Sequence, residues 1–211
     1  MKYKIFNVLP DYMTNTYLIW DEKTKEAALI DPAAESRKLV EELKNYNLKY
    51  IINTHGHGDH IGGNGHIKKE TGAKICIHEL DADMLTNPNL NLSSAMGRDF
   101  ITPKTDVLLK DKDELKFGEI TIKVIHTPGH TKGGICLLID DKLFCGDTLF
   151  QESIGRTDLP GGDTNTLLNS IKTKLFTLPN NVTAFPGHGP ETTIGFEKKN
   201  NPFVGEAAGY L

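Results

Sequence analysis

The segment Thr54-His55-Gly56-His57-Gly58-Asp59-His60 places three histidines and one aspartate within six residues, directly after a short apolar run. Such a run is typical of a fully buried strand. On an extended strand end, His55 and His57 would project to the same side and could bind one metal ion through their ring nitrogens. Beyond the next glycine, which relaxes the backbone, Asp59 and His60 are placed to bind a second ion. The segment therefore predicts a metal centre at the end of a strand.

Three later positions share this context, because each follows a predicted strand and stands next to a glycine. They are His130 in Thr127-Pro128-Gly129-His130-Thr131, Asp147 in Cys145-Gly146-Asp147-Thr148, and His188 in Phe185-Pro186-Gly187-His188-Gly189. In sheet-based α/β folds, strand ends at one edge converge to form the functional site. We therefore expect four separate strand-end loops to supply one cluster of seven ligands.

The chemistry of these seven side chains points to catalysis. Nitrogen and oxygen donors without a cysteine suit two divalent ions, with Zn²⁺ as the first choice and Fe or Mn also compatible. Asp147 is the carboxylate that we expect to bridge the ions. Two neighbouring ions can hold a bridging water, lower its pKa toward neutrality and polarise a substrate oxygen. Structural zinc sites are usually closed and contain cysteine, so a purely structural role is the weaker hypothesis.

Composition and charge restrict the possible partners. The chain has 211 residues, of which 38% are hydrophobic and 25% are charged, as expected for an ordinary globular protein. One domain covering residues 1–211 is the simplest interpretation. The net charge is −4, and the basic clusters are no longer than pairs, which disfavours nucleic acid as a partner.

The start of the sequence and its cysteines indicate a cytoplasmic protein. The first residues lack the apolar core and cleavage site of a signal peptide, and no apolar run approaches membrane-spanning length, so no membrane partner is expected. Cys76, Cys136 and Cys145 each lie in an apolar, strand-like run. An odd number of cysteines without a CxxC spacing fits buried, inert thiols in a reducing compartment.

The order of the apolar runs predicts an α/β fold in two similar halves. Each half contains strands, a helix, and a strand that ends in a polar loop. Two mixed sheets packed face to face, with helices on the outer faces, would bury all of these runs. The predicted strands are residues 3–8, 14–20, 27–31, 50–52, 74–77, 120–125, 135–139, 143–145 and 182–185. The predicted helices are residues 33–46, 61–70 and 164–176, and the polar stretch 79–103 is expected to be partly helical.

With these motifs in place, the sequence resembles the metallo-β-lactamase-fold superfamily over essentially its whole length. The hallmark His-x-His-x-Asp-His is matched by His55, His57, Asp59 and His60. The resemblance implies a four-layer αβ/βα sandwich of two mixed β-sheets with the site at one edge. It also implies a division of the ligands: His55, His57 and His130 on one ion, Asp59, His60 and His188 on the other, and Asp147 bridging.

Within that superfamily the sequence is similar to the short bacterial form of glyoxalase II. The similarity lies in Gly146-Asp147-Thr148-Leu149-Phe150 and Ile154-Gly155-Arg156-Thr157-Asp158. It implies hydrolysis of a small-molecule thioester, such as S-lactoylglutathione or another S-acyl thiol. A metal-bridging hydroxide would attack the thioester carbonyl while one ion stabilises the developing oxyanion. Asp59 would orient the hydroxide besides serving as a ligand.

Two features bear on which thiol carries the acyl group. Full-length enzymes of the glyoxalase II group have a C-terminal helical domain whose basic residues hold the glutathione carboxylates, whereas this sequence stops soon after Pro202-Phe203. Another low-molecular-weight thiol is therefore an alternative carrier. Arg156 could contact a substrate carboxylate, but its neighbour Asp158 offers an internal partner, which favours a role in fixing the loop.

Other hypotheses about the function remain open. An iron-dependent persulfide dioxygenase of the same fold also resembles the stretch around Arg156 and uses a single iron. A non-catalytic metal-binding module is disfavoured because every ligand position is filled, and a β-lactamase or an RNA nuclease finds less support in the local motifs or the charge. Outside the motif set, we expect His66, His78 and His126 to be ordinary core or surface residues.

Overall fold

The computed structural model describes residues 1–95, 97–206 and 208. Residues 207 and 209–211, at the end of the predicted domain, lie outside the described residues, as does Met96 in the polar stretch 79–103. None of the helices in the described part of the chain combines the length and the apolar character of a membrane span. The cytoplasmic location itself stays a prediction.

The first half of the chain forms a six-stranded mixed sheet. Its strands follow the order of the sequence, β1-β2-β3-β4-β5-β6. The pairs β1·β2 and β2·β3 are antiparallel, and the remaining pairs are parallel. The strands are β1 (Lys2–Asn7), β2 (Asn15–Trp20), β3 (Glu26–Ile30), β4 (Asn47–Ile52), β5 (Lys74–His78) and β6 (Val107–Leu109).

The second half forms another six-stranded mixed sheet, in the order β14-β13-β10-β9-β8-β7. Only β10 and β13 are paired in parallel. The strands are β7 (Glu114–Phe117), β8 (Ile120–His126), β9 (Ile135–Ile139), β10 (Lys142–Gly146), β13 (Thr183–Pro186) and β14 (Thr192–Thr193). A separate small ribbon pairs β11 (Leu149–Phe150) with β12 (Ser153–Ile154).

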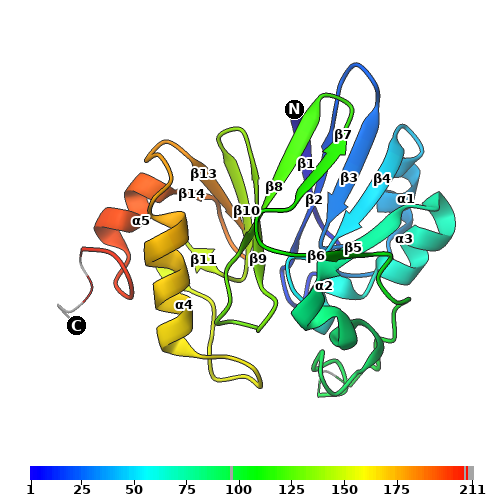
Figure 1. The fold of residues 1–211 in the computed structure, drawn as a ribbon. Coiled ribbons are helices and arrows are strands. Elements are labelled where there is room, and N and C mark those ends of the chain that lie inside the picture. Colours follow the sequence, from blue (N-terminus) through cyan, green and yellow to red (C-terminus); the bar gives the residue numbers. More distant parts are fainter. Residues whose placement is uncertain (96, 207, 209–211) are drawn as a thin grey trace.

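The two sheets pack face to face, and helices cover their outer faces (Figure 1). Alternating side chains of one strand serve both layers: Tyr17 and Ile19 of β2 belong to the core between the sheets, whereas Leu18 belongs to the core under the helices. The first sheet is covered by α1 (Arg37–Leu43) and α3 (Asn64–Thr71), and the second by α4 (Thr164–Ser170) and α5 (Ile194–Asn200). The predicted sandwich of two mixed sheets is confirmed.

Several predicted helices are shorter or divided. The helix predicted at residues 33–46 is α1 alone, which begins only after the Ser36 side chain caps its first turn. The helix predicted at 61–70 is two helices, α2 (Gly58–Ile61) and α3. They separate at Gly62, where a Cβ atom would lie 2.5 Å from the Ala33 carbonyl oxygen, so a neighbouring loop occupies the space a side chain would need.

The remaining differences concern short elements. The stretch 79–103 contains one 3₁₀ helix, η1 (Glu79–Thr86), and the helix predicted at 164–176 continues beyond α4 as a π-helical turn, η2 (Ile171–Leu175). The strands β6, β7, β11, β12 and β14 and the helix α5 were not among the predicted elements. The strand β7 has four residues, and the other four strands have only two or three, too few to show an alternating pattern.

Candidate metal centre

The fold brings all seven predicted ligands together where the two sheets meet. Each ligand lies just beyond a strand, but one local expectation was wrong: β4 ends at Ile52, so His55 and His57 lie in a loop and not on an extended strand end. Asp59 and His60 lie on α2, a helix of four residues. The other three, His130, Asp147 and His188, follow β8, β10 and β13 as predicted.

His55, His57 and His130 form what we term the first donor group. One ring nitrogen of each lies within 4.8 Å of the others, and all three side chains are buried. The His57 Nδ1 atom lies 3.0 Å from the His130 Nε2 atom. Because His55 and His57 come from the first half of the chain and His130 from the second, this group spans both sheets.

Asp59, His60 and His188 form the second donor group, whose donor atoms also lie within 4.8 Å of one another. The Nε2 atoms of His60 and His188 are 3.2 Å apart. An Asp59 carboxylate oxygen lies 3.3 Å from His188 Nε2. This group again combines both halves of the chain, but His188 is 26% exposed and faces the cavity.

Asp147 lies between the two donor groups. Its two carboxylate oxygens are 3.5 Å from His60 Nε2 and 3.6 Å from His130 Nε2. One of them also lies 3.5 Å from His188 Nε2. A single carboxylate therefore faces donors of both groups, the arrangement required of a bridging ligand.

In His60, His130 and His188, the ring nitrogen that faces away from the donor groups contacts another polar atom of the protein. His60 Nδ1 lies 3.0 Å from an Asp31 carboxylate oxygen, and His130 Nδ1 lies 2.7 Å from the Arg156 carbonyl oxygen. His188 Nδ1 lies 2.9 Å from the Tyr12 carbonyl oxygen. Such contacts fix the ring orientation and direct the other nitrogen toward a metal.

The role of Asp31 could not be predicted from its sequence context, because Asp31-Pro32 is locally typical of a helix start. Besides contacting His60, the carboxylate accepts hydrogen bonds from the Thr54 amide and hydroxyl at 2.8 and 2.6 Å. Asp31 also lies within 4.8 Å of donors of His55 and His60. Because its oxygens are already occupied by these contacts, we interpret it as the partner that orients His60.

Unpaired buried polar atoms indicate, independently of any sequence motif, that the donor groups suit metal ions. Among the described residues, only three buried side-chain atoms have no hydrogen-bond partner: His55 Nε2, His57 Nε2 and Asp147 Oδ1. Buried polar atoms are almost always paired in native structures. All three atoms belong to predicted ligands. His55 contacts Thr54 with its other ring nitrogen, and Asp147 Oδ1 lies 3.5 Å from His60 Nε2, so His55 Nε2 and Asp147 Oδ1 are atoms that a divalent cation would satisfy. His57 differs, because it faces His130 with its Nδ1 atom.

Electrostatics differ between the two groups. Burial lowers the pKa of His57 to about 3 and that of His55 well below its usual value, and the neighbouring imidazoles act in the same direction. These two rings are therefore neutral, the form in which imidazole binds a metal.

In the second group the carboxylates dominate. Burial opposes protonation of His60 and His188, but Asp59 and Asp147 outweigh it and raise the pKa of these rings to about 9 and about 10. In return, the His60 and His188 rings hold the pKa of Asp59 below and that of Asp147 well below the usual value in spite of burial. The protein thus keeps both carboxylates ionised at the site.

Gly187 shows how closely the backbone approaches the centre. A Cβ atom at this position would lie 2.2 Å from Asp147 Oδ1 and 2.7 Å from His60 Cε1. Any side chain here would displace two ligands. The glycine that precedes His188 is therefore a requirement of the site and not only of the turn.

A cavity of about 540 Å³ opens over the metal centre. Asp59, His130, Asp147 and His188 line it on one side. The remaining wall is largely apolar and is formed by side chains that include Tyr12, Leu92, Ala95, Phe150, Ile154 and Leu159. Its size lies within the range of small-molecule sites.

Arg156 occupies an intermediate position. It lines the cavity, but its guanidinium donates two hydrogen bonds, of 2.8 and 2.7 Å, to the Asp158 carboxylate. Both side chains are more than half exposed, so this ion pair contributes little stability and can exchange partners. The contact with Asp158 corresponds to the predicted role in fixing the loop. The place of Arg156 in the cavity wall leaves the predicted contact with a substrate carboxylate open to it.

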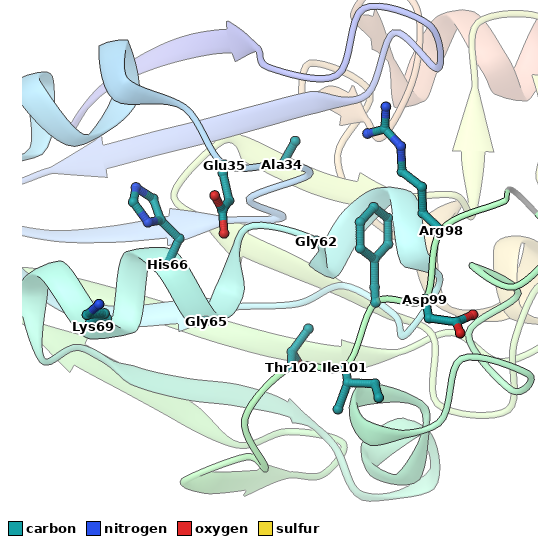
Figure 2. Close-up of a pocket in the computed structure, with 11 residues that line it drawn as sticks. Ala34, Glu35, Gly62, Gly65, His66, Lys69, Arg98, Asp99, Ile101 and Thr102 are labelled. Atoms are coloured by element: carbon teal, nitrogen blue, oxygen red, sulfur yellow. The ribbon is translucent and has the colours of Figure 1, made fainter.

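The other histidines lie outside the donor groups. His78 and His126 stack on each other with ring centroids 4.0 Å apart. His66 lines a larger cavity of about 720 Å³, formed by residues 34–35, the α2–α3 region and residues 98–102 (Figure 2). None of the seven predicted ligands lines this second cavity.

Comparisons with known proteins agree with this geometry. The sequence profile of the metallo-beta-lactamase superfamily matches residues 9–188. The hydroxyacylglutathione hydrolase GloC of Haemophilus influenzae is 38% identical over 204 residues, which cover 92% of this chain and 93% of GloC.

Two solved structures are similar over nearly the whole chain. The BLEG-1 B3 metallo-beta-lactamase has a TM-score of 0.91 and 38% identity, with 96% of this chain and 99% of that one covered. TTHA1623, crystallised in a di-iron-bound form, has a TM-score of 0.84 and 32% identity, with 95% and 100% covered. On its sequence and its fold, the chain belongs to the metallo-beta-lactamase superfamily of metal-dependent hydrolases and related enzymes.

Proposed function

We propose that this protein is a two-ion, metal-dependent hydrolase of a small-molecule thioester, such as S-lactoylglutathione or another S-acyl thiol. The observation that carries the proposal is the position of Asp147, whose carboxylate faces donors of both groups at the floor of one cavity. A site of this kind can hold two ions side by side and present them to the same substrate.

In the proposed assignment, the first donor group holds one ion, the second donor group holds the other, and Asp147 is shared. The nitrogen and oxygen donors suit Zn²⁺, with Fe or Mn as alternatives; the di-iron form of the similar TTHA1623 supports a two-ion site. When bound, such ions lower the pKa of a water molecule and polarise a carbonyl oxygen. The chain's own residues then have to orient the reactants.

Asp59 is the residue we propose for orienting the nucleophile. Its carboxylate lines the cavity, and its lowered pKa keeps it ionised, so it can accept a hydrogen bond from water at neutral pH. The Thr14 hydroxyl lies 3.5 Å from one Asp59 oxygen and restricts the rotation of the carboxylate. Asp59 is thus ligand and orienting group at once.

The shape of the cavity supports a small substrate. A volume of about 540 Å³ fits a compact molecule, and the largely apolar wall can cover an acyl chain or a thiol arm. GloC, which is named a hydroxyacylglutathione hydrolase, supports a glutathione thioester. In this assignment Arg156 exchanges Asp158 for a carboxylate of the substrate. The proposal involves no nucleic acid or membrane, in line with the net charge of −4.

The second donor group also helps to distinguish the hydrolase from the alternative function, a persulfide dioxygenase. A persulfide dioxygenase with a single iron needs only one set of ligands. Here Asp59, His60 and His188 converge as tightly as the first donor group does, which supports two ions and therefore the hydrolase.

The proposal is tested by purifying the protein without added metal, measuring its metal content, and assaying S-lactoylglutathione with the same sample. We expect about two equivalents of metal per chain and hydrolysis that a chelator abolishes. The matched control is His66→Ala, which removes a histidine outside both donor groups and should leave both results unchanged. One equivalent of iron, no hydrolysis, and oxygen uptake with glutathione persulfide would instead assign the protein to the dioxygenases.

A further inference from the structure

Asp81 is a buried carboxylate that belongs to neither donor group. It lies on η1 and is only 1% exposed. One oxygen accepts hydrogen bonds from the Gly56 amide at 3.1 Å and the Thr131 hydroxyl at 2.7 Å. The other oxygen accepts a hydrogen bond from the Gly133 amide at 2.7 Å. We call these four residues the Asp81 junction.

The Asp81 junction joins the two loops that carry the first donor group. Gly56 stands between His55 and His57, in the loop that follows β4 of the first sheet. Thr131 directly follows His130, in the loop that follows β8 of the second sheet. One carboxylate thus fixes the distance between ligands that come from different halves of the chain.

From this geometry we propose that Asp81 is the positioning residue of the first donor group, acting through the two loops and without touching the metal or the substrate. The inference rests on the proposed ligand assignment. Histidine nitrogens bind zinc at about 2.0–2.1 Å, so a small displacement of one loop against the other weakens binding. Loss of comparable outer contacts lowers metal affinity by about 10- to 100-fold.

The packing around the junction leaves little freedom. A Cβ atom on Gly133 would lie 2.7 Å from an Asp81 carboxylate oxygen, so the loop presses against the carboxylate. Close by, His78 caps the start of η1 and stacks on His126 at the end of β8. Two independent contacts therefore hold η1 against the loop of His130.

The second donor group is fixed by other contacts. Asp59 and His60 lie on α2, and His188 is held by the Tyr12 carbonyl and by the hydrogen bond from the Asn15 amide to the Gly187 carbonyl. We therefore expect the Asp81 junction to affect one of the two ions. This selectivity separates positioning of a donor group from a general contribution to stability.

Two variants test the junction from its two sides. Asp81→Asn keeps the size of the side chain but leaves only one oxygen, so either the Gly56 or the Gly133 amide loses its acceptor. Gly133→Ala keeps the Asp81 side chain but adds a Cβ atom 2.7 Å from an Asp81 carboxylate oxygen and 2.7 Å from the Asp81 backbone nitrogen, so the loop and η1 have to move apart. Gly133 is not among the glycines with positive φ, so the conformation of its own backbone suits alanine. If Asp81→Asn does not fold, Gly133→Ala carries the test.

Asp21 supplies the matched control. It is 6% exposed, and its two oxygens accept hydrogen bonds from the Lys23 amide at 2.8 Å and the Glu119 amide at 2.6 Å. Like Asp81, it joins a loop of the first half to one of the second, but no predicted ligand lies in either loop. Asp21→Asn therefore reproduces the loss of a backbone acceptor away from the metal centre.

The experiment titrates each metal-free protein with Co²⁺, follows the visible absorption of the bound ion, and measures thermal unfolding of the same samples. We expect Asp81→Asn and Gly133→Ala to bind one of two Co²⁺ equivalents about 10- to 100-fold more weakly and the other as the parent does. Asp21→Asn should lower the melting temperature and bind both equivalents normally.

The alternative outcomes are distinct. Normal binding of both equivalents by the two junction variants, or equal weakening by Asp21→Asn, would overturn the positioning role. Failure of the two-ion assignment would appear earlier, because the parent protein itself would then not bind two equivalents of Co²⁺. Failure of the proposed thioesterase activity would appear in the S-lactoylglutathione assay of the parent protein, whatever the junction variants do.

Discussion

The first donor group consists of three buried imidazoles, whereas the second combines two imidazoles with a carboxylate and lies nearer to solvent. Burial keeps the His55 and His57 rings neutral, while the carboxylates around His60 and His188 hold protons on those rings to high pH. One group is therefore ready for a cation, and the other has to release protons to receive one. Replacing one imidazole of a three-residue donor group by a carboxylate, and bringing the group nearer to solvent, thus changes its charge, its access and its proton linkage.

The shared carboxylate provides the largest test of this comparison. Replacing Asp147 by alanine removes a donor from both groups, so we expect the metal content to fall below one equivalent. Activity should fall by roughly a thousandfold or more, because metal ions contribute several kcal/mol of charge stabilisation to such reactions. Metal analysis and thioester hydrolysis measure both effects. The control is Asp141→Ala at an exposed turn; wild-type metal content in Asp147→Ala would show that Asp147 is not shared.

Single histidine variants should each remove one of the two proposed ions and leave the other bound. His57→Ala removes a ligand of the first donor group and His188→Ala one of the second, so each variant should retain about one equivalent of metal. Because hydrolysis in the proposed mechanism needs both ions, activity should fall by about a hundredfold or more in each. Co²⁺ spectra should differ between the two variants, since the remaining ion has different ligands. Identical spectra would contradict two separate donor groups.

A smaller effect is expected from Asp31→Asn. Asp31 has a positive φ of 49°, a conformation that asparagine tolerates. The amide can place a donor opposite His60 Nδ1, which favours the tautomer whose Nε2 atom carries a proton and cannot bind a metal. We expect the second ion to bind about 10- to 100-fold more weakly and the first ion to be unaffected. Competition with a chromophoric chelator measures both affinities, and equal weakening of both ions would refute the orienting role.

The pH dependence of metal binding tests the comparison without any substitution. The pKa of His57 is about 3, so the first donor group should bind its ion with little pH dependence above neutrality. The pKa values of about 9 and about 10 for His60 and His188 mean that these rings release protons when the second ion binds. Affinity of that ion should therefore rise with pH from 6 to 9, by about tenfold per pH unit for each proton released. Equal slopes for the two ions would contradict the comparison.

The sequence predicted which side chains come together better than it predicted the backbone that carries them. His130, Asp147 and His188 could be found because each follows a strand and stands beside a glycine, and a strand end is a local feature. The backbone around residues 54–63 was not predictable in the same way. The break between α2 and α3 at Gly62, for example, depends on the Ala33 carbonyl, which comes near only in the folded chain.

Asp31 and Asp81 were missed for a related reason. The local sequence around Asp31 is typical of a helix start, and Asp81 lies in a polar stretch without a periodic pattern. The role of each aspartate depends on the groups that its carboxylate contacts. Asp31 contacts Thr54 and His60. Asp81 contacts Gly56, Thr131 and Gly133. Each of those residues lies between 23 and 52 positions away from its aspartate in the sequence, so a single sequence holds no local signal for these contacts.

The distribution of ligands along the chain also determines when the centre can be completed during biosynthesis. Neither donor group is complete within the first sheet: the first requires His130 and the second requires His188. His60 and His188 are separated by 128 residues, which a ribosome takes on the order of ten seconds to add. The nascent chain therefore contains four of the proposed ligands well before their partners exist. The first donor group can be completed once His130 has been added, and the second only after His188 has been added.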